Sequence, residues 1–533
     1  MYAHVALMII AWAVIMPVSI VLSVARSRYH LLGQVLFHLV NSLGVFTGFV
    51  YNHSTPDLYE RNAHHPIGWI VTSFAIAWTI MSLFAAYDEH KSRRKTPITA
   101  QNVAHHIRFH RYSDYAEDRF SRDSGQGTER NSLSLLGSPR QDSEEVFHGK
   151  QEEPGSPLSD DEGEEIDTKL GKKSLLGNNR VDRFISRSVR RFASPQATKV
   201  IRVSQIILEK FLLLLGFLAI ASGFVVYGGV FRERAIYSGL AHFTKGGIFF
   251  WYGLLTLGRW MGAFSEFGWA WNIRPSYPIV SRWKTRVPSA EFTESFVIWL
   301  YGATNVFMEH LNKWGKAWSH QDFEHVSITL LFFGGGLLGM MIESSRIKEL
   351  LNTNVEMQRS EEEGEVHGAE SRFHASGEVA AEERDPLSTQ PSAHQTSLNP
   401  MPGLVIMLLG IMMSSHHQDS MVSTMMHSQW GSLFAVFAMA RAVTYISLYI
   451  KPPTSNFPAR PPSELVAAFC LTAGGLMFMF SARDTVEAIE ANGLDAMAIF
   501  TVTMGFTGVL LAWEVVVFAI KGWAIRRECA ATC

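Results

Sequence analysis

Long apolar runs recur along this 533-residue chain, and they constrain its fold more than any other feature. Three of them fall at residues 3–24, 31–51 and 65–87, and each is long enough to cross a hydrocarbon layer of roughly 30 Å at about 1.5 Å per helical residue. Further runs cover residues 205–230, 242–264, 294–310, 323–343, 401–415, 425–450, 464–482 and 494–520. The pattern predicts an all-α fold: a polytopic transmembrane helical bundle of about eleven spans in a lipid bilayer.

Charged residues make up 18% of the chain and gather between the apolar runs. Two polar stretches, residues 91–204 and 346–400, are rich in Ser, Glu, Arg and Gly, a composition typical of disordered loops. Their segments GSPRQDSEEV and GSPLSDDEGEE place Ser-Pro beside acidic residues, so kinases or adaptor proteins are candidate partners there. The formal net charge of −2 gives no reason to expect nucleic-acid binding.

These stretches divide the chain into five parts. A transmembrane domain covers residues 1–90 and is followed by the first loop, 91–204. A histidine-rich transmembrane domain is split by the second loop, 346–400, into residues 205–345 and 401–533, the latter ending in a short cytosolic tail.

Basic residues predict the orientation of the spans. No positive charge precedes the first span, whereas Arg26 and Arg28 follow it, so the N-terminus is expected outside. The basic stretch at residues 91–95, Lys451 and Arg526 then fall on the cytosolic side with both loops and the C-terminus. The expected location is the plasma membrane or an endomembrane.

Each of the first three spans carries a histidine, and an ionisable side chain in lipid usually faces a partner or a cofactor. His4 opens the first span, His64 and His65 open the third, and His38 lies about 10 Å into the second. Because successive spans alternate in direction, His4 and His65 share a membrane face, and His38 lies nearer the other. This arrangement favours haem b held by His4 and His65, with His64 as a competing ligand.

The surrounding residues resemble the transmembrane core of the ascorbate-reducible two-haem cytochrome b family. The resemblance is carried by His4-x-x-Leu7-Met8-x-x-Ala11-Trp12, Pro17, Ala25-Arg26, Phe37-His38-Leu39 and His65-x-Ile67-Gly68-Trp69. It implies electron transfer at or across a membrane. The second haem of that family would need His38 and a histidine at the start of the span SQIILEKFLLLLGF, which has none.

A closer resemblance, over most of the chain, is to the fungal Ytp family of integral membrane proteins. In that family a cytochrome-b-like N-terminal domain of unknown function precedes a histidine-rich C-terminal domain. The motifs that carry the resemblance are YNHSTPDLYERNAHHPIGW, EFGWAWN, DFEHVSITLLFFGGGLLG and HHQDSMVSTMMHSQWG.

Histidines and carboxylates also gather at the predicted outer ends of the later spans. Those that begin or end different spans are His310, His325, His417 and His427, with Glu309 and Glu324 beside two of them. Imidazole and carboxylate ligands suit zinc, iron or copper, so a shared metal site is one hypothesis. Interfacial histidines that satisfy loop carbonyls are the alternative.

Buried charges and glycines complete the prediction. Arg441 and Glu514 lie within spans and are expected to neutralise each other, with a proton path as the alternative, whereas Arg259 is expected to reach the interface. The glycines of residues 334–339 are expected to let a neighbouring helix approach closely, with the approach of a flat ligand as the alternative. The sequence thus leaves three functions open: a b-type haem protein for electron transfer, a membrane metalloprotein or metal transporter, and a scaffold with phosphoregulated loops.

Overall fold

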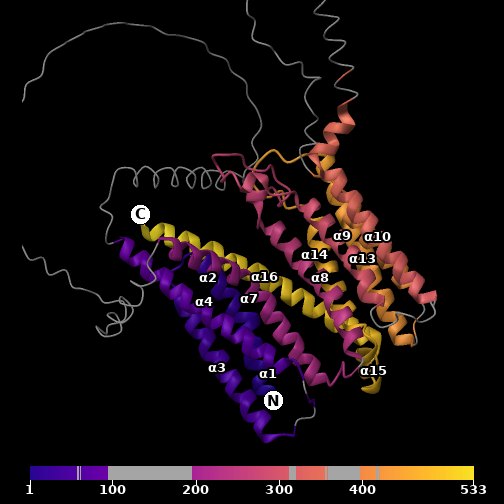
Figure 1. Ribbon diagram of the computed structural model, residues 1–533, viewed down its shortest axis with the longest axis horizontal. Coiled ribbons are helices and arrows are strands. Elements are labelled where there is room, and N and C mark those ends of the chain that lie inside the picture. Colours follow the sequence, from indigo (N-terminus) through magenta and orange to yellow (C-terminus); the bar gives the residue numbers. More distant parts are fainter. Residues whose placement is uncertain are drawn as a thin grey trace, which may run out of the picture. The chain divides into compact units, whose positions relative to one another are not determined.

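The computed structural model describes residues 1–56, 59–60, 62–93, 195–233, 235–310, 320–353, 357, 397–415, 418 and 420–532. In these ranges all regular structure is helical and no strand occurs, so the all-α prediction is confirmed (Figure 1). Most of the two predicted loops lies outside the described residues.

The helices fall into an N-terminal and a C-terminal series. The first series is α1 (Tyr2–Ile9), the π-helical segment η1 (Ile10–Ile15), α2 (Met16–Val24), α3 (His30–Ser54), α4 (His64–Arg93) and α7 (Pro195–Gly228). The second series is α8 (Ala235–Met261), α9 (Ala290–His310), α10 (His320–Glu343), α12 (Met401–Ser414), α13 (Met421–Ile450), α14 (Ser463–Phe480), α15 (Arg483–Ala491) and α16 (Ala496–Thr532).

Within the described residues, eight helices are long and apolar enough to cross a membrane, and they coincide with eight of the predicted spans. The predicted spans at α8, α9 and α12 are not among them; of these three, α12 is apolar but has only 14 residues. Apolar side chains such as Phe46 and Phe49 of α3 stay exposed on the protein surface, as lipid-facing residues do. The chain is therefore a polytopic membrane protein, while the total of about eleven spans stays a prediction.

The described chain forms two compact units. One contains Met1–Ala75 and Glu209–Cys533, and the other contains Ile76–Leu208. Inside the second unit, Gln205 Nε2 donates a hydrogen bond to Ser82 Oγ at 3.2 Å. The first unit combines the N-terminal helices with the C-terminal bundle, and every site described below lies within it.

The π-helical segment η1 has a local cause and a distant partner. Pro17 has no N–H, so it cannot bond to the carbonyl four residues earlier, that of Ala13, and its ring crowds that carbonyl. The Ala13 oxygen instead accepts a hydrogen bond of 2.9 Å from Trp513 Nε1 of α16. Through this hydrogen bond the π-helical segment connects the first span to the last helix, α16.

In the C-terminal bundle, helices pack in close pairs: α8 with α14, α9 with α10, and α13 with both α12 and α14. Glycine makes the approach possible. A Cβ on Gly246 of α8 would lie 2.5 Å from the carbonyl oxygen of Gly475 on α14, a distance that no larger residue tolerates. On α10, a Cβ on Gly336 would meet the backbone of Trp299 on α9, which confirms the predicted packing role of that glycine.

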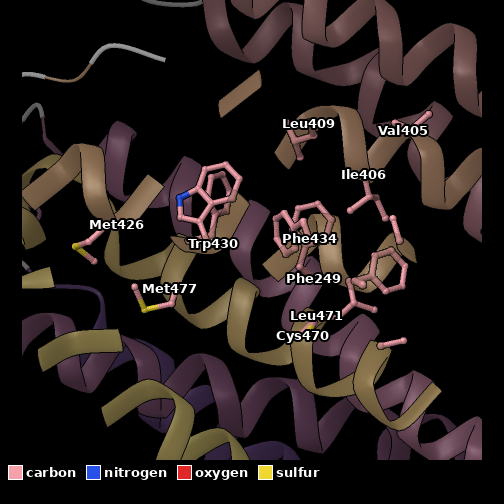
Figure 2. Close-up of a cluster of buried hydrophobic side chains, with 14 of the residues drawn as sticks. Phe249, Val405, Ile406, Leu409, Met426, Trp430, Phe434, Cys470, Leu471 and Met477 are labelled. Atoms are coloured by element: carbon pink, nitrogen blue, oxygen red, sulfur yellow. The ribbon is translucent and has the colours of Figure 1, made fainter. Parts of the chain in front are cut away.

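A large apolar core fills the space between α8, α12, α13 and α14. Its centre is aromatic: the ring centroids of Phe249 and Phe434 lie 4.3 Å apart, and those of Trp430 and Phe434 lie 5.5 Å apart (Figure 2). Cys470 is buried in the same cluster. These contacts fix the four helices around the polar site described below.

We expect Trp513→Phe to destabilise the protein by about 1–3 kcal/mol, because it removes the hydrogen bond that the Ala13 carbonyl accepts from α16 in a water-free environment. Thermal unfolding in detergent would measure the loss. Pro17→Ala restores an N–H four residues after Ala13, so the double variant should lose less than Trp513→Phe alone. Trp69→Phe, at a half-exposed tryptophan, is the control and should change little; a double variant as unstable as the sum of the singles would contradict the assignment.

Candidate functional site

The N-terminal helices bring His4 and His64 together. Their ring centroids lie 6.2 Å apart, and both rings lie against glycine. A Cβ on Gly48 of α3 would lie 2.6 Å from His4 Nδ1, and a Cβ on Gly223 of α7 would lie 3.0 Å from His64 Cε1. The two imidazoles thus occupy spaces that only glycine leaves open.

Hydrogen bonds fix the tautomer of both rings. His4 Nδ1 lies 2.8 Å from the carbonyl oxygen of Gly44, which can only accept, so Nδ1 carries the proton. Ser222 Oγ donates to the Ala219 carbonyl at 2.9 Å and therefore accepts from His64 Nδ1 at 3.0 Å. In both rings the lone pair is consequently on Nε2.

The other two predicted haem ligands are placed differently. His65 is exposed, and its Nε2 accepts a hydrogen bond of 3.3 Å from Trp69 Nε1 one helical turn later. His38 is half-buried in α3 with its ring against Phe37. The structure therefore pairs His4 with the competing ligand His64 and not with His65.

The most concentrated polar feature of the C-terminal bundle is a group of five buried side chains, here called the charge cluster: Arg259 of α8, Glu291 and Glu294 of α9, Arg441 of α13 and Glu464 of α14. Four ion pairs connect them: Arg259–Glu291 at 3.1 Å, Arg259–Glu294 at 2.6 Å, Arg441–Glu294 at 3.3 Å and Arg441–Glu464 at 2.7 Å.

The loop after α8 completes the charge cluster. The ring of Trp271, a residue with φ of 52°, lies 4.4 Å from Arg259 Cζ and 5.7 Å from Arg441 Cζ. Arg259 Nε also donates to the Trp269 carbonyl at 2.7 Å. Asn272 anchors the loop, since its Nδ2 donates to the Asn456 carbonyl at 2.8 Å on the loop between α13 and α14. The motif EFGWAWN thus inserts an indole beside two guanidinium groups.

Two sequence predictions about these charges are wrong. Arg441 was expected to pair with Glu514, but it pairs with Glu294 and Glu464. Arg259 was expected to reach the interface, yet its side chain is only 1% exposed and pairs with α9. The reason is that α9 starts with two carboxylates three residues apart on one face, and packing turns that face toward α8 and α13.

A cavity of about 1180 Å³ lies beside the charge cluster. Its wall is mostly aliphatic and aromatic, with contributions from α7, α8, α9, α10, α12, α13, α14 and α15. Near its polar rim lie Ser420 before α13 and Glu487 and Glu490 on α15. Glu294 lines the same cavity, so this one carboxylate belongs both to the cavity wall and to the charge cluster.

The predicted metal ligands are only partly described. His325 and His427 both line this cavity, together with His242. Glu324 lies on α10 beside His325, while His417 and the side chains of Glu309 and His310 lie outside the described residues. Among the side chains that are described, no group of three or more His, Cys, Asp or Glu is arranged to hold a metal ion. The shared metal site therefore stays a prediction.

We expect Arg441→Gln to destabilise the protein by about 3–5 kcal/mol, because it leaves Glu464, which is fully buried, without a cation. Arg441→Lys keeps the charge but contacts fewer partners and should lose less. Arg483→Gln is the control: Arg483 pairs with Glu487 on the exposed face of α15 and should contribute within about 0.5 kcal/mol. Equal melting temperatures for Arg441→Gln and Arg483→Gln would show that the charge cluster does not hold the bundle together.

Comparisons with known proteins place this architecture in a family. A family model described as "Protein YTP1-like, C-terminal" matches residues 215–522, and one described as "Domain of unknown function (DUF2427)" matches residues 1–88. No solved structure matches the chain.

Three yeast relatives extend the match. The "Uncharacterized membrane protein C3B8.06" of Schizosaccharomyces pombe is 32% identical over 98% of this chain and 94% of its own length. The "Uncharacterized membrane protein YCR061W" of Saccharomyces cerevisiae is 34% identical over 58% of this chain and 47% of its own length. "Protein YTP1" of the same yeast is 20% identical over 43% of this chain and 38% of its own length. The chain therefore belongs to the YTP1-like family of membrane proteins.

Proposed function

We propose that this protein is a membrane redox protein that holds one haem b between His4 and His64. The single observation that carries the proposal is the pairing of these two imidazoles at 6.2 Å with the lone pair of each on Nε2. The resemblance of the first 90 residues to the two-haem cytochrome b core supports the same reading.

The spacing of the rings fits two ligands of one metal. With metal–nitrogen bonds of about 2 Å and an imidazole radius of about 1 Å, two rings on opposite sides of one ion have centroids roughly 6 Å apart. The bonds from Nδ1 to Gly44 and Ser222 are of the kind that orients a metal-bound histidine and raises its basicity.

The number of ligands favours haem over a bare ion. Zinc or copper held by protein alone usually needs three or four side chains, and no such group exists among the described residues. Haem iron receives four nitrogens from its own ring and needs only two from the protein. Bound there, haem would supply one-electron transfer, and two imidazoles would leave no open position for oxygen.

A reduced-minus-oxidised visible spectrum of the purified full chain tests the proposal. We expect a b-type spectrum that His4→Ala and His64→Ala abolish, because each removes one of the two imidazoles that would hold the haem iron. Ser222→Ala should weaken haem retention by about 10-fold, since it removes the acceptor that orients His64.

The matched control for His64→Ala is His65→Ala, one residue along the same helix. His65 faces Trp69, so this variant and His38→Ala should keep the spectrum. A wild-type protein without haem absorbance, or a spectrum lost in His65→Ala and kept in His64→Ala, would refute the pairing.

A second candidate is a transition-metal carrier: His242, His325 and His427 line one cavity, although these described side chains are not arranged to share a single ion. His242 and His427 each have Nδ1 within 2.9 Å of a backbone carbonyl one turn earlier, which places the lone pair on Nε2. Metal analysis of the protein used for the spectrum tests it: a metal carrier would contain bound zinc or copper in wild type and would bind it at least about 10-fold more weakly in His427→Ala. If wild type and His427→Ala contained equal amounts of metal, the metal would not be bound at His427 in this cavity.

A further inference from the structure

The charge cluster has more carboxylates than cations. Three glutamates face two arginines, and all five side chains are at least nine-tenths buried. If every group were ionised, the cluster would carry one net negative charge inside a membrane protein, where an uncompensated charge is strongly unfavourable. Something of charge +1 is needed to balance it.

Neighbouring elements supply no further cation to these carboxylates among the described residues. Tyr252 of α8 and Tyr445 of α13 contribute hydroxyl groups, and Trp271 contributes an indole. Lys245 lies on α8 but about 21 Å along the helix axis from Arg259. The Lys210 ammonium of α7 lies 5.8 Å from the ring of Phe264.

On α16, the neighbouring charged group is another carboxyl. Glu514 Oε1 would lie 3.6 Å from a Cβ on Gly258, the residue before Arg259. It therefore adds no positive charge near the cluster, and its own carboxyl must be separated from the three cluster glutamates in any experiment.

The cluster also has unused hydrogen-bonding capacity. Glu464 Oε2 is buried and has no hydrogen-bond partner in the described structure. One oxygen of the most buried carboxyl is thus available to carry a hydrogen. The other Glu464 oxygen already faces Arg441 Nε at 2.7 Å.

We propose that the charge cluster is a proton-binding site: one exchangeable proton is shared by the carboxyls of Glu291, Glu294 and Glu464, and Glu294 connects it to the cavity. A metal cation is a poorer candidate for the missing charge. The two oxygens of Glu294 face the guanidinium groups of Arg259 and Arg441, which repel a second cation, whereas a proton neutralises a carboxyl without adding a charged neighbour.

Placement on the cavity wall gives the proton a route. Glu294 lines the cavity of about 1180 Å³ and bridges both arginines, so protonation of this residue would weaken two ion pairs at once. A proton that moves from Glu464 or Glu291 to Glu294 would therefore reach the cavity and loosen the contact between α8, α9 and α13. The site thus links proton uptake to the packing of three helices.

The proposal makes a prediction about stoichiometry. At neutral pH the number of protonated carboxyls should equal the number of cluster carboxyls minus the number of cluster guanidinium groups. Wild type should have one, any single Glu→Gln variant in the cluster should have none, and Arg259→Gln should have two.

Infrared spectroscopy of the purified full chain in lipid measures this number through the carbonyl band of protonated carboxylic acids. Glu514→Gln serves as the parent protein, so that this separate buried carboxyl does not contribute. Adding Glu464→Gln or Glu294→Gln should remove one carboxyl equivalent, whereas adding Glu487→Gln, at the exposed face of α15, should remove none. The band should also shift in D₂O, because the proton exchanges through the cavity.

Several outcomes would overturn the proposal. A parent band that Glu464→Gln and Glu294→Gln both leave unchanged would mean that the cluster holds no proton. A band that does not shift after a day in D₂O would mean that the proton does not exchange. If Arg259→Gln fails to fold, the two isosteric Glu→Gln variants still decide the question, since each retains shape and hydrogen-bonding capacity.

Discussion

Buried charge in a membrane protein must be balanced inside the protein, and the C-terminal bundle is built around that constraint. Water is absent from the bilayer interior, so an arginine on a membrane helix needs a carboxylate from a neighbouring helix. Arg259 and Arg441 meet this need by joining α8, α9, α13 and α14 through a shared carboxylate, Glu294. The cavity wall includes Glu294 of this cluster as well as Phe249 and Phe478 of the aromatic core.

Helix positions could be predicted from the sequence because each apolar run is a local signal. The rotation of each helix about its own axis could not be predicted in this way, as His64 and His65 of α4 show. His64 and His65 have the same depth in the membrane, but consecutive residues on a helix point about 100° apart. Only packing against α7, where Ser222 meets His64 and Gly223 leaves room for its ring, decides which of the two faces His4. The prediction of His4 with His65 rested on their shared membrane face, which does not distinguish His65 from His64.

The charge cluster was missed for a related reason. Its five members are spread over 206 positions, from Arg259 to Glu464, and the sequence does not say which of several membrane charges meet. One signal was present: Glu291 and Glu294 lie three residues apart at the start of an apolar run, so they share a helix face. A pair of carboxylates on one face predicts cations opposite it, and Arg259 and Arg441 are each the charged residue of an otherwise apolar helix segment. The motif EFGWAWN was recognised, but its role beside the guanidinium groups depends on contacts that appear only in three dimensions.

The last helix connects the two candidate sites. The helix α16 contacts α2 and also α8, α13 and α14. The compact unit Met1–Ala75 plus Glu209–Cys533 therefore holds all of the range matched by one family model, residues 215–522, and most of the range matched by the other, residues 1–88. Trp513 of α16 donates a hydrogen bond to the Ala13 carbonyl, which Pro17 cannot reach with an N–H. Near the end of α16, Glu528 accepts hydrogen bonds from the backbone N–H and the Nε of Arg28 at 3.0 and 3.1 Å. Between these two contacts Glu514 lies against α8 at Gly258. A movement of α8 that follows a change of charge in the cluster would therefore act on α16 at Glu514. The next residue toward the N-terminus is Trp513, which donates the hydrogen bond to Ala13 in the first span. That span also carries His4.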